Sequence, residues 1–263
     1  GVTLTLQGQL FYMYAQNIVS QYKEAVGELE RFQAQKIALS GTISVFSASV
    51  LVDVFMVNII RDFTAIYPST MIKIIETNND ELLSYVVNGY CEVALLSASK
   101  NYVEKMQQTR KDIEYLLLLE DQVVVCARKD HPLMKYKTLD FDSLTEYAKK
   151  SHFQFSLYQI LPFAHPEVSY TYSISNSPNA DIHKKFMMEN VAVTHMPYLA
   201  YQNKFQQDGF AMVPLKGTPI LGHYLIWRKD EENSNYYLLR YFLEFLQKKI
   251  KKQFPNCKNH FDI

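Results

Sequence analysis

Eight polar residues stand where apolar, β-branched runs of this sequence end or where a helix is expected to begin. They are Ser47, Ser49, Thr77, Asn78, Ser97, Asn176, Ser177 and His195. In an open α/β sheet, ligands bind in the crevice outside the carboxyl ends of the strands. Hydroxyl groups and the backbone N–H groups at a helix N-terminus suit a carboxylate or another small anion. The pattern predicts a pocket for a small polar or anionic molecule; the alternative is that these residues only cap helices.

Two charged or titratable residues near these strand ends allow two interpretations each. His195 is either a ligand contact that titrates near neutrality or a packed histidine at a strand end. Arg128 either supplies a counter-charge where the chain passes between domains or is solvated beside Lys129 and Asp130.

The elements that must position these residues alternate between strand and helix at short intervals. Such alternation is typical of a parallel sheet with crossover helices. A longer apolar run at 114–130 exceeds what one small sheet needs, so we expect it to cross into a second domain. Asn79 and Asp80 are expected to cap the second helix. The elements expected before the crossover cover 41–47, 50–68, 71–77, 81–89 and 91–97.

The remainder of the chain repeats the alternation and ends in an amphipathic helix. Lysines crowd the C-terminal end of that helix, where they either complement the helix macrodipole or form a basic patch for nucleic acid. The expected strands lie at 153–155, 168–175, 191–195 and 210–215, and the expected helices at 180–188 and 235–254.

The first helix, expected from about Leu6 to Ile37, carries one narrow apolar stripe. Its residues recur at steps of three and four, close to the spacing of a coiled-coil seam. A stripe of this length predicts a partner helix, and the alternative is a helix packed on the chain's own sheet. The stripe consists of Phe11, Tyr14, Ile18, Tyr22, Ala25, Leu29 and Phe32.

The composition argues against several classes of function. Lys plus Arg (27) equals Asp plus Glu (27), so this piece alone has no basic surplus for gripping DNA. Three scattered cysteines favour neither a disulfide framework nor a zinc site and suit a reducing cytoplasm. No apolar run is long enough for a membrane span. Common catalytic and phosphate-binding motifs are missing, so we expect no enzyme and no cofactor.

Taken together and in order, several stretches resemble the LysR-type transcriptional regulators. The stretch "LTLQGQLFYMYAQNIVSQY" is similar to the linker helix of that family, and Gly41 precedes "ISVFSAS" as its first strand. The stretch "FTAIYPSTMIKIIETNNDELLSYVVNGYCEVALL" and the turn His131-Pro132-Leu133 continue the similarity. The resemblance covers essentially the whole chain.

The resemblance implies an architecture and a regulatory function. A winged helix-turn-helix domain is expected to precede Gly1 and to carry all DNA binding. Residues 1–40 then form a linker and dimerisation helix, and 41–263 form an effector-binding domain with two Rossmann-like α/β subdomains of periplasmic-binding-protein type. Subdomain I is expected at about 41–119 and 216–263, and subdomain II at about 120–215. The implied partners are a second copy or a homotetramer and a small effector; the implied location is the cytoplasm.

Two positions depart from the family's usual pattern. Glu92 stands where an Asp is common, and Glu189-Asn190 stand where glycines are common. The second departure concerns the expected pocket wall around His195 and Met196, and it indicates an unusual or unidentified effector. The alternatives to a regulator are a periplasmic solute-binding protein, which leaves the long helical stripe and the cysteines unexplained, and a small α/β enzyme.

Overall fold

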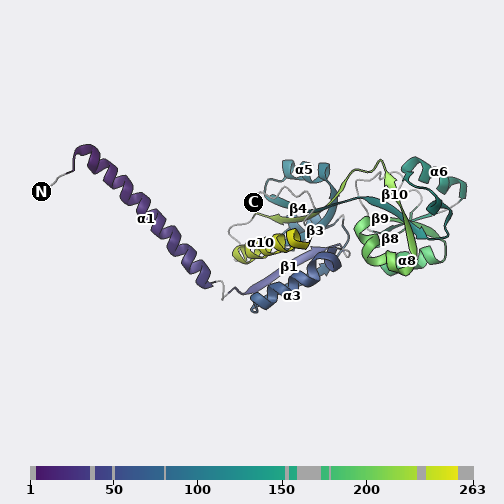
Figure 1. Cartoon of the computed structure of the whole chain (residues 1–263), viewed down its shortest axis with the longest axis horizontal. Helices are drawn as coiled ribbons and strands as arrows, with labels where there is room; N and C mark the ends of the chain where they lie inside the picture. Colours follow the sequence, from purple (N-terminus) through teal and green to yellow (C-terminus); the bar gives the residue numbers. More distant parts are fainter. Residues whose placement is uncertain are drawn as a thin grey trace.

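The computed structural model describes residues 4–35, 39–48, 51–79, 81–151, 154–158, 173–177, 179–229 and 235–253. Within these ranges the chain forms two β-sheets flanked by helices. One long helix precedes them in the sequence and lies to one side of them (Figure 1). The expected mixed α/β fold with two subdomains is confirmed.

The first sheet contains five strands in the order β2-β1-β3-β11-β4. Three of them, β1, β2 and β3, are parallel, whereas β11 runs antiparallel between β3 and β4. All seven residues of β3 are buried, which explains its continuous run of apolar and small residues. The strands are β1 (Gly41–Ser47), β2 (Thr70–Glu76), β3 (Val93–Ser99), β4 (Ile113–Asp121) and β11 (Leu221–Arg228).

Helices cover both faces of this sheet. The connections from β1 to β2 and from β2 to β3 run in opposite directions across the sheet, so right-handed crossovers place α3 and α4 on opposite faces. Beside α3 lies α10, and Phe63 meets Phe242 and Phe245 edge-on with centroids 5.3 Å apart. The elements are η2 (Val52–Met56, π-helical), α3 (Val57–Ile66), α4 (Leu82–Val87), α5 (Lys100–Thr109) and α10 (Tyr236–Gln253).

The second sheet contains six strands in the order β6-β10-β5-β9-β7-β8. Its centre is antiparallel, because β5 pairs with both β9 and β10 in that sense, while β7 is parallel to β8 and β9. Its strands are β5 (Val123–Arg128), β6 (Leu139–Asp140), β7 (Gln154–Tyr158), β8 (Ser173–Ser177), β9 (Ala192–Pro197) and β10 (Phe210–Lys216). Its helices include α6 (Phe141–Ser151), α8 (Ala180–Met188) and α9 (Tyr198–Ala200).

The chain passes between the two sheets twice. The first passage is nearly direct, because β4 ends at Asp121 and β5 begins at Val123. The second uses the short segment 217–220 between β10 and β11. The apolar run at 114–130 thus crosses from one sheet into the other, as expected; the residue boundaries of the subdomains stay a prediction.

The long helix α1 (Leu6–Gln35) extends away from both sheets (Figure 1). Its stripe is open to solvent, with Phe11 75%, Tyr14 58%, Ile18 66% and Tyr22 69% exposed. Ala25 is exposed as well, and the side chains of Leu29 and Phe32 lie outside the described residues. The described part of α1 therefore does not bury its stripe against the chain's own sheets.

One local prediction is wrong. Asn79 does not cap α4, whose first turn follows Glu81 and has no side-chain cap. Its carboxamide bonds instead to the backbone of Ser97 on β3, and Asp80 lies outside the described residues. The two buried backbone groups of Ser97 compete for the amide more effectively than a helix end that water reaches.

Candidate functional site

The ends of β1 and β2 lie together at the edge of the first sheet. The Thr77 N–H donates to the carbonyl of Ser47 over 3.1 Å. Ser47 is fully buried, and its hydroxyl donates to the Ala48 carbonyl at 2.9 Å. The Thr77 hydroxyl donates to Glu81 Oε2 at 2.9 Å. Two of the predicted residues are thus neighbours, and each hydroxyl already has a partner within the chain.

Asn78 and Ser49 are the other two residues predicted at this edge. Asn78, which follows Thr77, is half-buried, and its carbonyl accepts from the Glu81 N–H at 3.2 Å. Ser49 lies outside the described residues.

Asn79 extends the sheet beyond the end of β1. Its Nδ2 donates to the Ser97 carbonyl at 2.8 Å, and its Oδ1 accepts from the Ser97 N–H at 2.7 Å. The last β3 residue paired with β1 is Leu95, so the next backbone groups on that side belong to Ser97. The side chain of Asn79 therefore satisfies the backbone of Ser97 as one further strand residue would.

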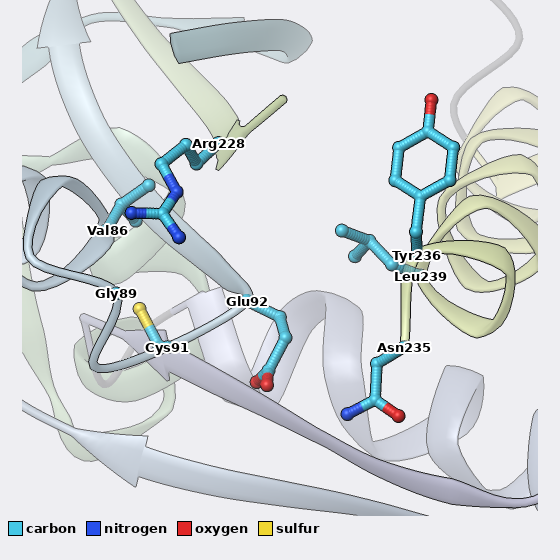
Figure 2. Close-up of a pocket in the computed structure, with 8 residues that line it drawn as sticks. All are labelled: Val86, Gly89, Cys91, Glu92, Arg228, Asn235, Tyr236 and Leu239. Atoms are coloured by element: carbon cyan, nitrogen blue, oxygen red, sulfur yellow. The ribbon is translucent and has the colours of Figure 1, made fainter. Parts of the chain in front are cut away.

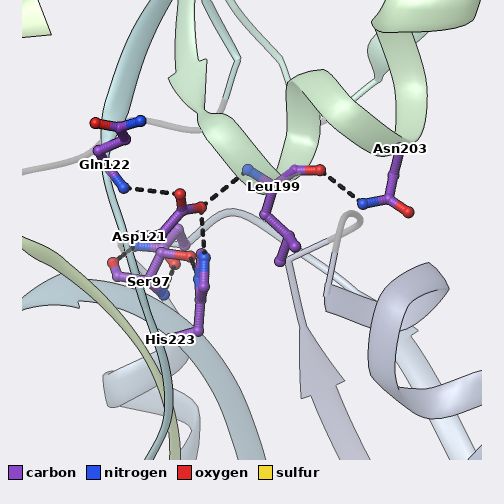
Figure 3. A network of polar contacts seen from close by, with 7 residues as sticks. Ser97, Asp121, Gln122, Leu199, Asn203 and His223 are labelled. Atoms are coloured by element: carbon purple, nitrogen blue, oxygen red, sulfur yellow. Dashed lines mark hydrogen bonds and ion pairs between the residues drawn. The ribbon is translucent and has the colours of Figure 1, made fainter. Parts of the chain in front are cut away.

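A buried polar chain begins at the hydroxyl of Ser97 (Figure 3). Ser97 Oγ lies 2.8 Å from His223 Nδ1, and His223 Nε2 lies 2.9 Å from Asp121 Oδ2. Ser97 and His223 are fully buried, and the Asp121 side chain is only 5% exposed. Because an ionised carboxylate only accepts, the imidazole Nε2–H donates to Asp121, and Nδ1 is the atom that faces the serine.

Asp121 connects this chain to the second subdomain (Figure 3). Its Oδ2 also accepts from the Leu199 N–H at 3.0 Å, and its Oδ1 accepts from the Gln122 N–H at 2.7 Å. The Gln122 carbonyl accepts from the Tyr198 N–H at 2.9 Å. The first turn of α9 is thereby tied to the first passage between the sheets, and through His223 to β11.

The residue types Ser, His and Asp are those of a hydrolase triad, but their setting differs. A catalytic serine needs a path to substrate and an oxyanion pocket in front of it. Ser97 is fully buried, with β11 paired to it on one side and the Asn79 side chain bonded to its backbone on the other. The arrangement is suited to holding two subdomains together rather than to attack on a substrate.

In the second subdomain, His195 is 6% exposed on β9 and pairs in register with Val125 and Leu157. Burial, with a smaller effect of His183, lowers the pKa of His195 to about 4. The imidazole is therefore neutral near pH 7. This agrees with the packed-histidine interpretation, and its role as a ligand contact stays a prediction.

The two predicted residues at the end of β8 flank the helix that follows. Ser177 is half-buried, its Oγ accepts from the Asn179 N–H at 3.1 Å, and its carbonyl lies 2.8 Å from His183 Nε2. Asn176 lies on β8, and its side chain is outside the described residues. Asn179 is the residue that caps α8, because its side chain accepts from the Asp181 N–H.

Both departures from the usual family pattern have a structural role. Asn190 has a φ of 55° directly after the end of α8, a left-handed conformation that asparagine tolerates better than other non-glycine residues. Glu92 Oε2 accepts from the Ser44 N–H at 2.7 Å and so fastens the start of β3 to β1.

Glu92 also borders a cavity beside α10, between Arg228 and Asn235 (Figure 2). With about 40 Å³, the cavity has room for a water molecule and not for a metabolite. The Cys91 thiol at its wall is buried, and burial raises its pKa to about 12, so it is not a thiolate at neutral pH.

Arg128 forms an ion pair with Asp130 and donates to the Met188 carbonyl at 3.0 Å, so it has partners within its own subdomain. Within the described ranges, no group of three or more His, Cys, Asp or Glu side chains is placed to hold a metal ion. None of the described helices is both long enough and apolar enough to cross a bilayer.

The sequence of the chain is similar to that of known proteins. A family model described as the LysR substrate binding domain matches residues 37–251. The HTH-type transcriptional regulator MJ0300 of Methanocaldococcus jannaschii, itself uncharacterized, is 22% identical over 144 residues, which are 55% of this chain and 45% of that protein. The similarly uncharacterized HTH-type regulator YbhD of Escherichia coli is 23% identical over 146 residues, 56% of this chain and 43% of that protein. This chain matches less than half the length of either relative.

Among solved structures, a full-length OxyR variant from Pseudomonas aeruginosa superposes with a TM-score of 0.59 at 16% identity. The superposition covers 95% of this chain and 81% of the other. At this identity the similarity concerns the fold, in which two α/β subdomains follow a long helix.

Proposed function

This chain belongs to the family of LysR substrate-binding domains, and on that premise we propose that it is the regulatory part of a LysR-type transcriptional regulator. It binds a small effector between its two subdomains and passes the effect on through an assembly of several copies. DNA binding belongs to a helix-turn-helix domain elsewhere in the full protein, and the protein acts in the cytoplasm.

The observation that carries the proposal is the connection between the two sheets. Strand ends from both sheets meet where the chain passes twice between them, and Asp121 links β4, β11 and α9 there. Two stable bodies with a defined junction can adopt more than one arrangement. A ligand that prefers one arrangement shifts the population toward it, which regulation requires.

The proposed effector is a small polar or anionic metabolite. Thr77, Asn78 and Ser177 offer half-buried or exposed hydrogen-bonding groups at the strand ends, and Ser49 adds a further hydroxyl in sequence. The fully buried Ser47 and Ser97 are proposed to act by holding the backbone in place, because a ligand in the cleft does not reach their enclosed hydroxyls.

Assembly is proposed to use α1, as a homodimer or a homotetramer. Its exposed stripe offers a partner helix a continuous row of aromatic and aliphatic side chains. The same helix favours a regulator over a periplasmic solute-binding protein, because the second alternative leaves its exposed stripe unexplained. The enclosed Ser97 argues against the enzyme alternative.

A metabolite panel screened by thermal shift tests the effector proposal. A ligand of the native state at a hundredfold excess over its Kd stabilises the fold by about 2.7 kcal/mol, which is readily measured. Thr77→Ala is expected to weaken the hit about two- to tenfold, the equivalent of one lost hydrogen bond.

Thr64→Ala is the matched control, because the Thr64 hydroxyl also donates within the chain, to the Ile60 carbonyl, but lies on α3 away from the strand ends. Equal affinity of a confirmed ligand for both variants would remove Thr77 from the site. A screen in which no metabolite stabilises the chain would contradict the effector proposal itself.

A further inference from the structure

A further cavity lies on the α5 face of the first sheet, away from the predicted effector residues. It has a volume of about 700 Å³, within the range of small-molecule sites. Its floor is formed by Val103 of α5, Tyr115 and Leu117 of β4, and Tyr224 of β11. Pro219 and Ile220, from the second passage between the sheets, also line it. None of the eight predicted effector residues lines it.

Tyr224 is the polar group that this cavity leaves without a partner. Its side chain is buried at 3% exposure, yet no described residue forms a hydrogen bond with its hydroxyl. The hydroxyl oxygen is not fully enclosed by protein atoms. It therefore reaches solvent through the cavity. A buried hydroxyl that opens onto a cavity is available to hydrogen-bond an occupant.

The position of the Tyr224 ring requires a glycine at residue 222. A Cβ atom added to Gly222 would lie 2.4 Å from Tyr224 Cε2 and 2.6 Å from its hydroxyl oxygen. The ring therefore lies directly over the backbone of β11, and only glycine allows it there. Tyr115 meets the same ring edge-on, with centroids 5.9 Å apart, so two aromatic rings line one end of the cavity.

Two carboxylates stand at the rim above these rings. Glu104 comes from α5 and Glu120 from the end of β4. Burial, with smaller effects of Tyr115, Glu120 and Glu104, raises the pKa of Tyr224 to about 12, so its hydroxyl stays protonated near neutral pH. Glu120 is exposed and has no ion-pair partner among the described residues.

The only basic residue of the lining does not neutralise this rim. Lys100 is 80% exposed and reaches Glu104 at 3.6 Å, which is the geometry of a weak surface pair. With one lysine against two glutamates, the rim keeps one net negative charge. A negative rim over an apolar, aromatic floor complements a cation that carries an apolar body.

We propose that this cavity is a second ligand site, which takes a small organic cation: a protonated amine on an apolar or aromatic carbon frame. The apolar frame lies on Val103, Leu117 and the tyrosine rings. The ammonium group lies between Glu104 and Glu120, within reach of the Tyr224 hydroxyl as an acceptor. The site is independent of the effector cleft.

The test uses 2-phenylethylamine, with 2-phenylethanol and phenylacetate as neutral and anionic analogues of the same shape. Isothermal titration calorimetry of the full chain at low ionic strength is expected to show the amine binding at least about tenfold more tightly than either analogue. Added salt weakens the amine selectively, because the attraction is between charges near the surface.

Three variants locate the binding. Glu120→Gln is expected to weaken the amine about two- to fivefold, and Lys100→Gln to strengthen it about twofold, since the two changes move the rim charge in opposite directions. Tyr224→Phe removes only the hydroxyl and weakens binding by a similar factor. Glu114→Gln is the matched control, because Glu114 lies on the same strand β4 outside the cavity.

The outcomes that overturn the proposal are specific. Equal affinity for the amine and the alcohol would show that charge plays no part, and preference for phenylacetate would reverse the assignment. Glu120→Gln behaving like Glu114→Gln would place the binding elsewhere. No binding up to about 10 mM amine would refute the site. Each outcome leaves the effector proposal untouched, because the two residue sets do not overlap.

Discussion

Replacing Asn79 with alanine is expected to destabilise the first subdomain far more than an ordinary surface change. The substitution removes two hydrogen bonds, of 2.8 and 2.7 Å, and leaves the N–H and the carbonyl of the fully buried Ser97 without partners. Each unpaired buried group costs about 1–3 kcal/mol. Allowing for partial entry of water, we expect a loss of about 2–5 kcal/mol in the free energy of unfolding.

Urea unfolding followed by tryptophan fluorescence measures this loss directly. Trp227 is the single tryptophan of the chain, it is buried, and it lies on β11 paired with β3. Its signal therefore reports on the sheet that Asn79 supports. With a urea dependence of about 2–3 kcal/mol per molar, the midpoint should fall by about 1–2 M.

The control is the neighbouring residue, and a charge variant adds a second readout. Asn78 is half-buried and has no side-chain hydrogen bond among the described residues, so Asn78→Ala should change stability by no more than about 0.5 kcal/mol. Asn79→Asp sets a carboxylate oxygen against the Ser97 carbonyl. That variant should recover relative to the native protein as acid protonates the carboxyl and lets it donate. If Asn79→Ala loses no more than Asn78→Ala, the strand-extending role of Asn79 is refuted.

Two further predictions concern assembly and pH. The double substitution Phe11→Lys and Ile18→Lys should weaken assembly, as measured by sedimentation equilibrium, whereas Gln21→Lys on the polar face of α1 should not. If the unaltered chain sediments as a 30.7 kDa monomer, the stripe does not have the proposed role. The pKa of His195 is lowered from 6.5 to about 4 on folding, so the unfolded chain binds protons more tightly and stability falls as pH drops through that window. Between pH 7 and 4.5 the native protein should lose about 2–3 kcal/mol more than His195→Gln, and parallel pH profiles of the two proteins would refute the assignment.

The elements that the sequence predicts well depend on local signals. Strand β1 and helix α8 have the predicted bounds, because a β-branched run after glycine and an amphipathic stretch after Asn179 are complete within a few residues. Helices α5 and α6 were not anticipated. Their sequences are short and rich in charged and polar residues, so only a few apolar side chains mark the face that packs on the sheet.

The polar junction could not be predicted for a different reason. Ser97 was singled out as a strand end, but its partner His223 lies 126 positions away, and Asp121 lies 102 positions from that histidine. Asn79 carries the local signature of a helix cap, and its true partner on β3 becomes visible only once the strands are aligned. Side-chain pairing across such separations follows from the tertiary fold, which residue spacing alone does not contain.

The position of β11 between β3 and β4 imposes an order on folding during synthesis. Every strand of the second sheet lies within residues 123–216, so that sheet can assemble as soon as this stretch has left the ribosome. The first sheet has to wait, because β3 and β4 have no neighbour between them until residues 221–228 arrive. Until then, β3 and β4 present unpaired backbone edges and an apolar surface. A nascent chain halted between these two points is therefore the species most exposed to aggregation and most dependent on chaperones.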